Sequence, residues 1–302
     1  MFMKKLTKER IKAPFLAAVP MIIVLVFSVI AILVVTIISL AVGKDPDNIS
    51  EWTDFLCMEF AMLAGAATAV ALVNKRNKTR LRDFMKIKDF DIMVPIMLLL
   101  FGWSAGEICD HIGALVLSQF MTVEPNVTDL SHVTSILSAV ICAPIFEELL
   151  FRFAGCELGK GAYSIPVICV ANSIFFAAVH GYNIQGFGNV LVGAVCMAYV
   201  YCKTGNLLYT MLEHALHNAL CIIDFEQFSL FGTPLYYEKN GFVFSGWWWL
   251  AINAVVLVVC LVYYFKVFRK KYVDDKFKVN RETGLPDTAI AAEEIAEDTV
   301  TA

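Results

Sequence analysis

Long apolar stretches alternate with short polar segments along most of the chain. An α-helix needs about 20 predominantly apolar residues to cross a membrane, and most of these stretches approach or exceed that length. The pattern predicts spanning helices at residues 14–42, 53–73, 92–121, 133–153, 165–179, 190–201, 207–223 and 246–264. The predicted fold class is therefore all-α, a polytopic membrane helix bundle of about eight transmembrane helices.

Composition supports this prediction. The 302 residues are 59% hydrophobic, with a mean hydropathy of +0.68, whereas soluble domains are about half apolar or less. No basic surface typical of nucleic-acid binding is present, so we expect the lipid bilayer as a partner and no nucleic acid. The nine cysteines include no CxxC pair and fall mainly inside apolar stretches, which favours small buried residues over a disulfide framework. The basic N-terminus is followed by apolar residues with no obvious cleavage site, which indicates a retained helix.

Positive charges predict how the chain crosses the membrane. Basic residues gather in five segments that all fall on one side of an eight-helix arrangement, and the loops on the other side are acidic or neutral. Cytoplasmic loops carry the excess of Lys and Arg, so both termini are predicted to be cytoplasmic, in an integral protein of a bacterial plasma membrane. The five segments are residues 1–12, 74–88, the turn with Lys160, the turn with Lys203, and 266–278.

The same pattern predicts four regions. Residues 1–129 form three N-terminal helices with a cytoplasmic basic loop, and 130–225 form a core of four helices that carries the chemistry. Residues 226–281 supply a loop, the last helix and a basic juxtamembrane segment. Residues 282–302 are acidic and rich in small residues, and such a composition predicts a disordered tail.

Two adjacent acids in the fourth predicted helix are the first candidate site. An ionisable side chain in hydrocarbon costs on the order of 2.5–3.5 kcal/mol, so it marks a functional site by default. Glu148 and Arg152 are four residues apart, with the acid first, which favours an ion pair on one helix face. Glu147 points about 100° away on a regular helix and is predicted to be the carboxylate available for chemistry. The alternative is that both acids only hold helices together.

Other polar side chains fall on two later helices. His180 ends the fifth predicted helix, and the seventh carries His214 and Asn218 on one face. A carboxylate, imidazoles and an amide could activate water and stabilise an oxyanion, or they could bind a divalent metal such as zinc through Glu147, His180 and His214. The spacing does not match HExxH, and the metal question stays open. His217 is expected to be a packed or surface histidine. Glu107, Asp110 and His111 either line the cavity or only bond a neighbouring helix, and the second alternative is favoured.

Three motifs in order resemble the CPBP family of intramembrane proteases, also called the ABI or type II CAAX prenyl endopeptidase family. They are Glu147-Glu148-Leu-Leu-Phe-Arg152 as EExxxR, Phe176-Ala-Ala-Val-His180 as FxxxH, and His214-Ala-Leu-His-Asn218 as HxxxN. The resemblance covers about residues 130–225. It implies that Glu147 and His180 activate the attacking water and that Glu148 and Arg152 support them. It further implies that His214 and Asn218 stabilise the oxyanion.

The function predicted on this basis is an intramembrane endopeptidase that hydrolyses a membrane-associated or lipidated peptide or protein. One alternative is a non-catalytic role on the same scaffold, such as bacteriocin self-immunity or another membrane binding function. Another is a transporter that uses Glu147 and the histidines as a proton relay. The intact motifs disfavour the first alternative, and the lack of internal repeats disfavours the second.

Overall fold

A computed structural model describes residues 2–43, 45, 50–124, 132–223 and 228–272. It confirms the all-α membrane class: within these residues, six helices are long and apolar enough to cross a membrane, and Ile165–Val179 is a shorter apolar helix. A further helix of 15 residues, α9 (Leu207–Cys221), carries the predicted HxxxN motif. The predicted acidic tail, 282–302, lies outside the described residues.

The described residues divide into two compact units. The first unit holds the described residues up to 86 and those from 132 to 168; the second holds those from 87 to 124 and from 169 to 272. The first unit contains α1 (Phe2–Ala41), α2 (Glu51–Asn77), the short 3-10 helix η1 (Leu81–Phe84) and one long helix built from several segments. That long helix runs over Val133–Gly159.

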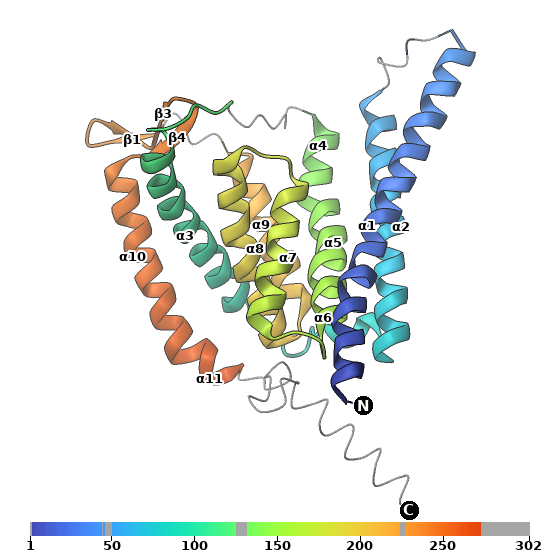
Figure 1. Cartoon of the computed structure of the whole chain (residues 1–302). Helices are drawn as coiled ribbons and strands as arrows, with labels where there is room; N and C mark the ends of the chain where they lie inside the picture. Colours follow the sequence, from blue (N-terminus) through green and yellow to red (C-terminus); the bar gives the residue numbers. More distant parts are fainter. Residues whose placement is uncertain (1, 44, 46–49, 125–131, 224–227, 273–302) are drawn as a thin grey trace, which may run out of the picture. The chain divides into compact units, whose positions relative to one another are not determined.

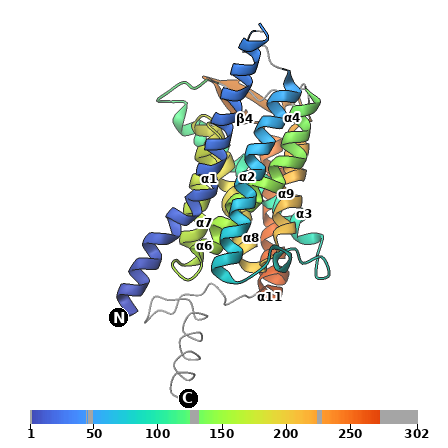
Figure 2. The same ribbon diagram turned by 90° about the vertical axis from the view of Figure 1, so that its right-hand side faces the viewer.

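Helices α1 and α2 lie side by side in the first unit (Figures 1 and 2). Gly65 is buried at their contact, where a Cβ atom would overlap Val24 and lie 2.9 Å from the carbonyl oxygen of Pro20. Ala61, Ala66 and Ala69 are also buried on α2. Small residues let helix backbones approach closely in a membrane, where packing is the main attraction between helices. Gly65 thus allows the close approach of α1 and α2.

The long helix of the first unit changes its hydrogen-bonding pattern twice. It begins as α4 (Val133–Leu137), passes through the π stretch η2 (Ser138–Cys142), and returns to α-helix in α5 (Ala143–Glu147). A second π stretch, η3 (Glu148–Cys156), leads into α6 (Glu157–Gly159). π turns inside α-helices commonly occur at functional sites. The two predicted catalytic acids stand at the junction of α5 and η3.

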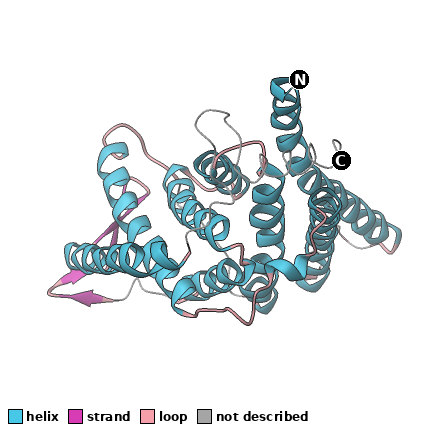
Figure 3. Cartoon of the chain, turned by 90° about the horizontal axis from the view of Figure 1, so that it is seen from below, coloured by secondary structure: helices cyan, strands magenta, loops and turns pink. Residues whose placement is uncertain are grey.

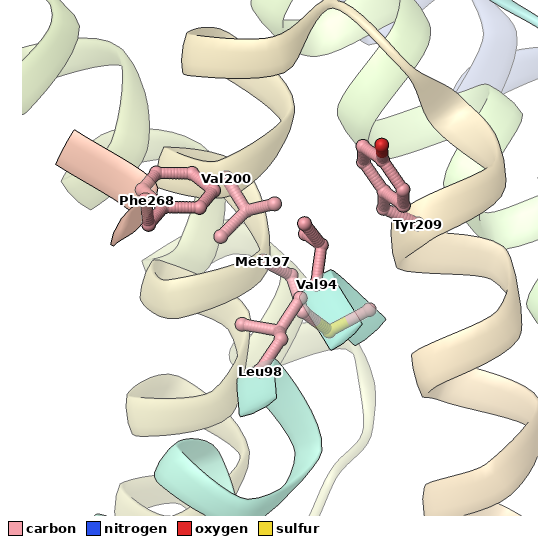
Figure 4. Close-up of a cluster of buried hydrophobic side chains, with 6 residues drawn as sticks. All are labelled: Val94, Leu98, Met197, Val200, Tyr209 and Phe268. Atoms are coloured by element: carbon pink, nitrogen blue, oxygen red, sulfur yellow. The ribbon is translucent and has the colours of Figure 1, made fainter. Parts of the chain in front are cut away.

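The second unit is built from α3 (Met93–Leu117), most of α7 (Ile165–Val179), α8 (Ile184–Thr204), α9, and the C-terminal helix. That last helix comprises α10 (Trp247–Tyr263), the π stretch η4 (Tyr264–Phe268) and α11 (Arg269–Lys271). One of its hydrophobic clusters joins α3, α8, α9 and η4, and Figure 4 shows its side chains. The cluster consists of Val94, Leu98, Met197, Val200, Tyr209 and Phe268.

Two small antiparallel hairpins precede α10, in a region where the sequence predicted a loop (Figure 3). Strand β1 (Ser229–Leu230) pairs with β2 (Thr233–Pro234), and β3 (Tyr236–Lys239) pairs with β4 (Phe242–Ser245). Positive φ angles at Asn240 and Gly241 allow the tight turn between β3 and β4. Phe242 and Phe244 are buried on one face of β4, which attaches the hairpin to α3 through Ala114.

One predicted boundary was wrong. The sequence predicted the sixth helix over 190–201, but α8 already begins at Ile184. Its start is set by Asn183, whose side-chain oxygen accepts hydrogen bonds from the backbone N–H groups of Gln185 and Gly186. Helix α3 runs without interruption through the polar residues at 103–111.

Candidate active site

The predicted ion pair of the EExxxR motif is present in the first unit. Arg152 Nη1 lies 3.0 Å from Glu148 Oε1, and both side chains are fully buried. Removing two charges from water costs several kcal/mol per ion, and only close, well-oriented pairing offsets that cost. Each side chain therefore offsets part of the cost of burying the other.

Glu147 has different surroundings from Glu148. It is half-buried, and it is the last residue of α5, immediately before the π stretch that contains Glu148 and Arg152. A π stretch changes the angle between successive side chains, so directions calculated for a regular α-helix do not hold beyond Glu147. The different roles predicted for the two acids agree with their different burial.

A third acid, which the sequence did not single out, contacts the long helix of the first unit from α2. Glu59 of α2 accepts a hydrogen bond of 2.5 Å from the hydroxyl of Ser138. Its carboxylate also bonds the Cys142 thiol and interacts electrostatically with Glu147. The missed signal was an ionisable side chain within an apolar span, the same signal that identified Glu147 and Glu148.

His180 of the second unit is oriented by the FxxxH motif itself. Its Nδ1 lies 2.7 Å from the backbone carbonyl oxygen of Phe176, one helical turn earlier. A carbonyl oxygen only accepts, so Nδ1 carries the hydrogen, and in the neutral ring Nε2 holds the lone pair. The Phe176 ring also packs on the imidazole, with ring centroids 4.6 Å apart. Phe176 thus fixes both the tautomer and the position of His180.

The same phenylalanine joins the two histidine motifs. The Phe176 ring meets His214 edge-on, with centroids 6.0 Å apart, and His214 is 8% exposed. Asn218, one turn further along α9, is half-buried. Within the second unit, therefore, the motif residues His180 and His214 both contact the same aromatic side chain.

His217 is packed, as expected for a residue outside the motifs. Its ring lies 5.3 Å from the Trp103 ring, and its Nδ1 lies 4.0 Å from the carboxylate of the buried Glu213. The Trp103 contact joins α9 to α3, and the Glu213 contact lies within α9. They account for His217 without a role in chemistry.

Among the polar residues of α3, Asp110 bonds a neighbouring helix as expected, whereas Glu107 bonds the second hairpin. Asp110 accepts a hydrogen bond of 2.7 Å from the Asn189 amide on α8. Glu107 accepts one of 2.5 Å from the Tyr236 hydroxyl and one of 2.6 Å from the Ser245 hydroxyl, both on the second hairpin. Burial and the neighbouring Glu107 raise the pKa of Tyr236, so its hydroxyl stays protonated and donates. His111 packs edge-on against Phe244.

The residues considered from the sequence as metal ligands are Glu147, His180 and His214. In the part of the chain that the structure describes, no group of three or more His, Cys, Asp or Glu side chains is arranged to hold a metal ion. The candidate ligands belong to different units, with Glu147 in the first and His180 and His214 in the second.

Fold and site together define a class: a polytopic helical membrane protein with a buried carboxylate–guanidinium pair and oriented histidines. Residues 129–220 match the family model described as type II CAAX prenyl endopeptidase Rce1-like. The match includes every residue of the three motifs and confirms the family resemblance over this segment. The matched family is a family of proteases. Comparison with curated proteins and with solved structures found no match.

Proposed function

We propose that the protein is an intramembrane endopeptidase that hydrolyses a peptide bond of a membrane-associated or lipidated substrate. The observation that carries the proposal is the split between adjacent acids inside one membrane helix: Glu148 is ion-paired and fully buried, while Glu147 is half-buried beside it. A bundle that needed acids only for packing would have no reason to place a second carboxylate next to the pair at such cost. The Rce1-like match over 129–220 supports the same reading.

In the proposed mechanism Glu147 is the general base. Its carboxylate takes a proton from water while the water oxygen attacks the carbonyl carbon of the scissile bond. The proton then passes to the departing amine nitrogen as the C–N bond breaks. His180 orients the same water through Nε2, because Nδ1 is occupied by the Phe176 carbonyl.

His214 and Asn218 are proposed to stabilise the negative oxygen of the tetrahedral intermediate. The two residues are one turn apart on α9, so both side chains share a helix face. Preorganised donors of this kind act mainly in the transition state and contribute roughly 10²–10³ in rate each. Glu148 and Arg152 hold the helix segment that carries Glu147.

Metal dependence is decided by chelation of the purified protein. With water activated by side chains alone, phenanthroline or EDTA leaves the cleavage rate unchanged. Loss of activity on chelation, restored by zinc, would instead establish a metal-assisted reaction.

The test of the protease proposal starts from substrates. Membrane peptides are compared by mass spectrometry in cells that express the wild type or the Glu147→Gln variant, and candidate peptides, with and without a prenyl group, are then offered to purified protein in liposomes. Cleavage products should appear only with wild type. Asp54→Asn is the matched control, since it removes an exposed acid at the start of α2 and should keep full activity.

A further inference from the structure

Glu59 lies in a part of α2 whose neighbouring side chains mostly face lipid. Its neighbours Leu56, Met58, Phe60 and Leu63 are each at least half exposed, as expected for side chains that face lipid. Glu59 instead turns toward the long helix of the first unit and is half-buried there. An acid in this setting is costly, and the contacts that it makes indicate what it does.

The carboxylate of Glu59 is bonded to both ends of one π stretch. Ser138, the first residue of η2, donates its hydroxyl to Glu59 Oε1 at 2.5 Å. Cys142, the last residue of η2, donates its thiol to the same carboxylate group. Glu59 therefore links α2 to η2 and favours the π geometry of that stretch.

The π stretch leads directly to the proposed catalytic base. Only α5 (Ala143–Glu147) separates Cys142 from the Glu147 carboxylate, and Glu59 and Glu147 interact electrostatically. The direction of Glu147 relative to α2 thus depends on how η2 is wound. Glu59 lies outside the segment 129–220 that matches the protease family, so the contribution comes from the N-terminal helices.

We propose that Glu59 is a positioning residue for Glu147: by binding Ser138 and Cys142 it holds η2 in its π form and so sets the orientation and electrostatic surroundings of the base. The proposal rests on the proposed function, in which Glu147 activates water. It assigns the first two helices a part in catalysis that goes beyond anchoring.

The kinetic test compares Glu59→Gln, Glu59→Asp and Ser138→Ala with wild type in liposomes. A misplaced base lowers kcat by about 10- to 100-fold while KM stays within about twofold, because substrate binding is not touched. Glu59→Asp should recover part of the loss. Since Glu59 and Ser138 act through one contact, the double variant should be no slower than the slower single variant. Thr68→Val is the control, because Thr68 is a half-buried residue of α2 that bonds only within its own helix at Ala64.

A second readout does not depend on proteolysis. Loss of a hydrogen bond worth about 0.5–1.5 kcal/mol corresponds to about a 2- to 10-fold change, so Glu59→Ala should speed alkylation of Cys142 by this factor and leave Cys57 unchanged. The measurement is made by mass spectrometry in folded protein. Unchanged kcat in Glu59→Gln or unchanged alkylation of Cys142 would overturn the positioning role. Full activity of Glu147→Gln would overturn the proposed function, whatever Glu59 does.

Discussion

Adjacent residues in one helix have unlike surroundings, and this contrast is the basis of the proposed function. Glu148 is enclosed with Arg152, whereas Glu147 is only half-buried. The spacing of charged residues was enough to predict the ion pair, because an i, i+4 relation survives in most helical geometries. It was not enough to reveal Glu59, whose partners Ser138 and Cys142 are far away in sequence, or the Phe176 carbonyl, which is invisible to side-chain patterns.

Replacement of Glu147 by glutamine should abolish cleavage. Glutamine keeps the size and hydrogen-bonding capacity of the side chain but cannot take a proton from water, so kcat should fall on the order of 10²–10⁴. Initial rates in liposomes measure the loss, and an unchanged thermal unfolding curve shows that folding is intact. Full activity of this variant would contradict the protease proposal.

Replacement of Arg152 separates charge from geometry. Arg152→Ala leaves Glu148 buried without its cation and should destabilise the protein by roughly 3–5 kcal/mol. Arg152→Lys keeps the charge and should be milder, as judged by thermal unfolding in detergent. Equal damage from both variants would show that the planar guanidinium itself is required.

The elements follow the hydrophobic pattern in type but depart from it in detail. The helix over Ile165–Val179 has the predicted bounds, because turn residues flank a largely apolar stretch. The π stretches η2 and η3 were not predicted, since apolar periodicity does not distinguish one extra residue per turn. The hairpins before α10 were read as a loop, because their strands are only two to four residues long.

The second hairpin should be held in place mainly by Glu107. Tyr236→Phe and Ser245→Ala each remove one hydrogen bond to this partly buried carboxylate and should destabilise the hairpin by about 1–3 kcal/mol. Hydrogen exchange of the backbone amides in β3 and β4 measures the loss. Tyr237→Phe is the matched control, since Tyr237 is exposed and stacks on Phe244 instead.

At the scale of the whole molecule, hydrogen bonds within the first unit bring several of the predicted basic segments together. In the first unit Arg10 donates to the Ala162 carbonyl, and Arg76 donates to the Leu158 carbonyl. These bonds bring the N-terminal segment, the end of α2 and the turn near Lys160 to one end of that unit. At its other end, His132 lies 2.9 Å from Glu51. Such a grouping is what the charge pattern predicted, and a cytoplasmic location of the basic end remains a prediction.

Reporter fusions test the predicted orientation. A reporter placed after Lys88 and another after Lys271 should both give a cytoplasmic signal, because both positions belong to basic segments. A reporter at Glu124 should give the opposite signal. An external signal from either basic position would contradict the arrangement with both termini inside.

Low pH should remove the stability that the contact between Lys271 and Asp91 gives to the second unit. The hydrogen bond from Lys271, at 2.6 Å, holds the pKa of Asp91 below its ordinary value of 3.8. A carboxyl with a lowered folded pKa stabilises the protein above its unfolded pKa, and that stability is lost as the pH falls through the folded value. The difference in Tm between wild type and Asp91→Asn should therefore persist from neutral pH down to about 4 and vanish at lower pH. A difference that grew with acidification would contradict this sign.

The π stretch η2 also bears on how the chain tolerates changes in length. A π turn accommodates one residue more than an α turn, so the helix on either side stays in phase around the extra residue. Deleting Ala139 or Val140 should convert η2 to α-helix without rotating Glu147 about the helix axis. The same deletion within α2 would turn every later side chain by about 100°. Single-residue length variants of this membrane helix are thus expected to insert and fold, with Ser138 and Cys142 no longer spaced to bind Glu59 together.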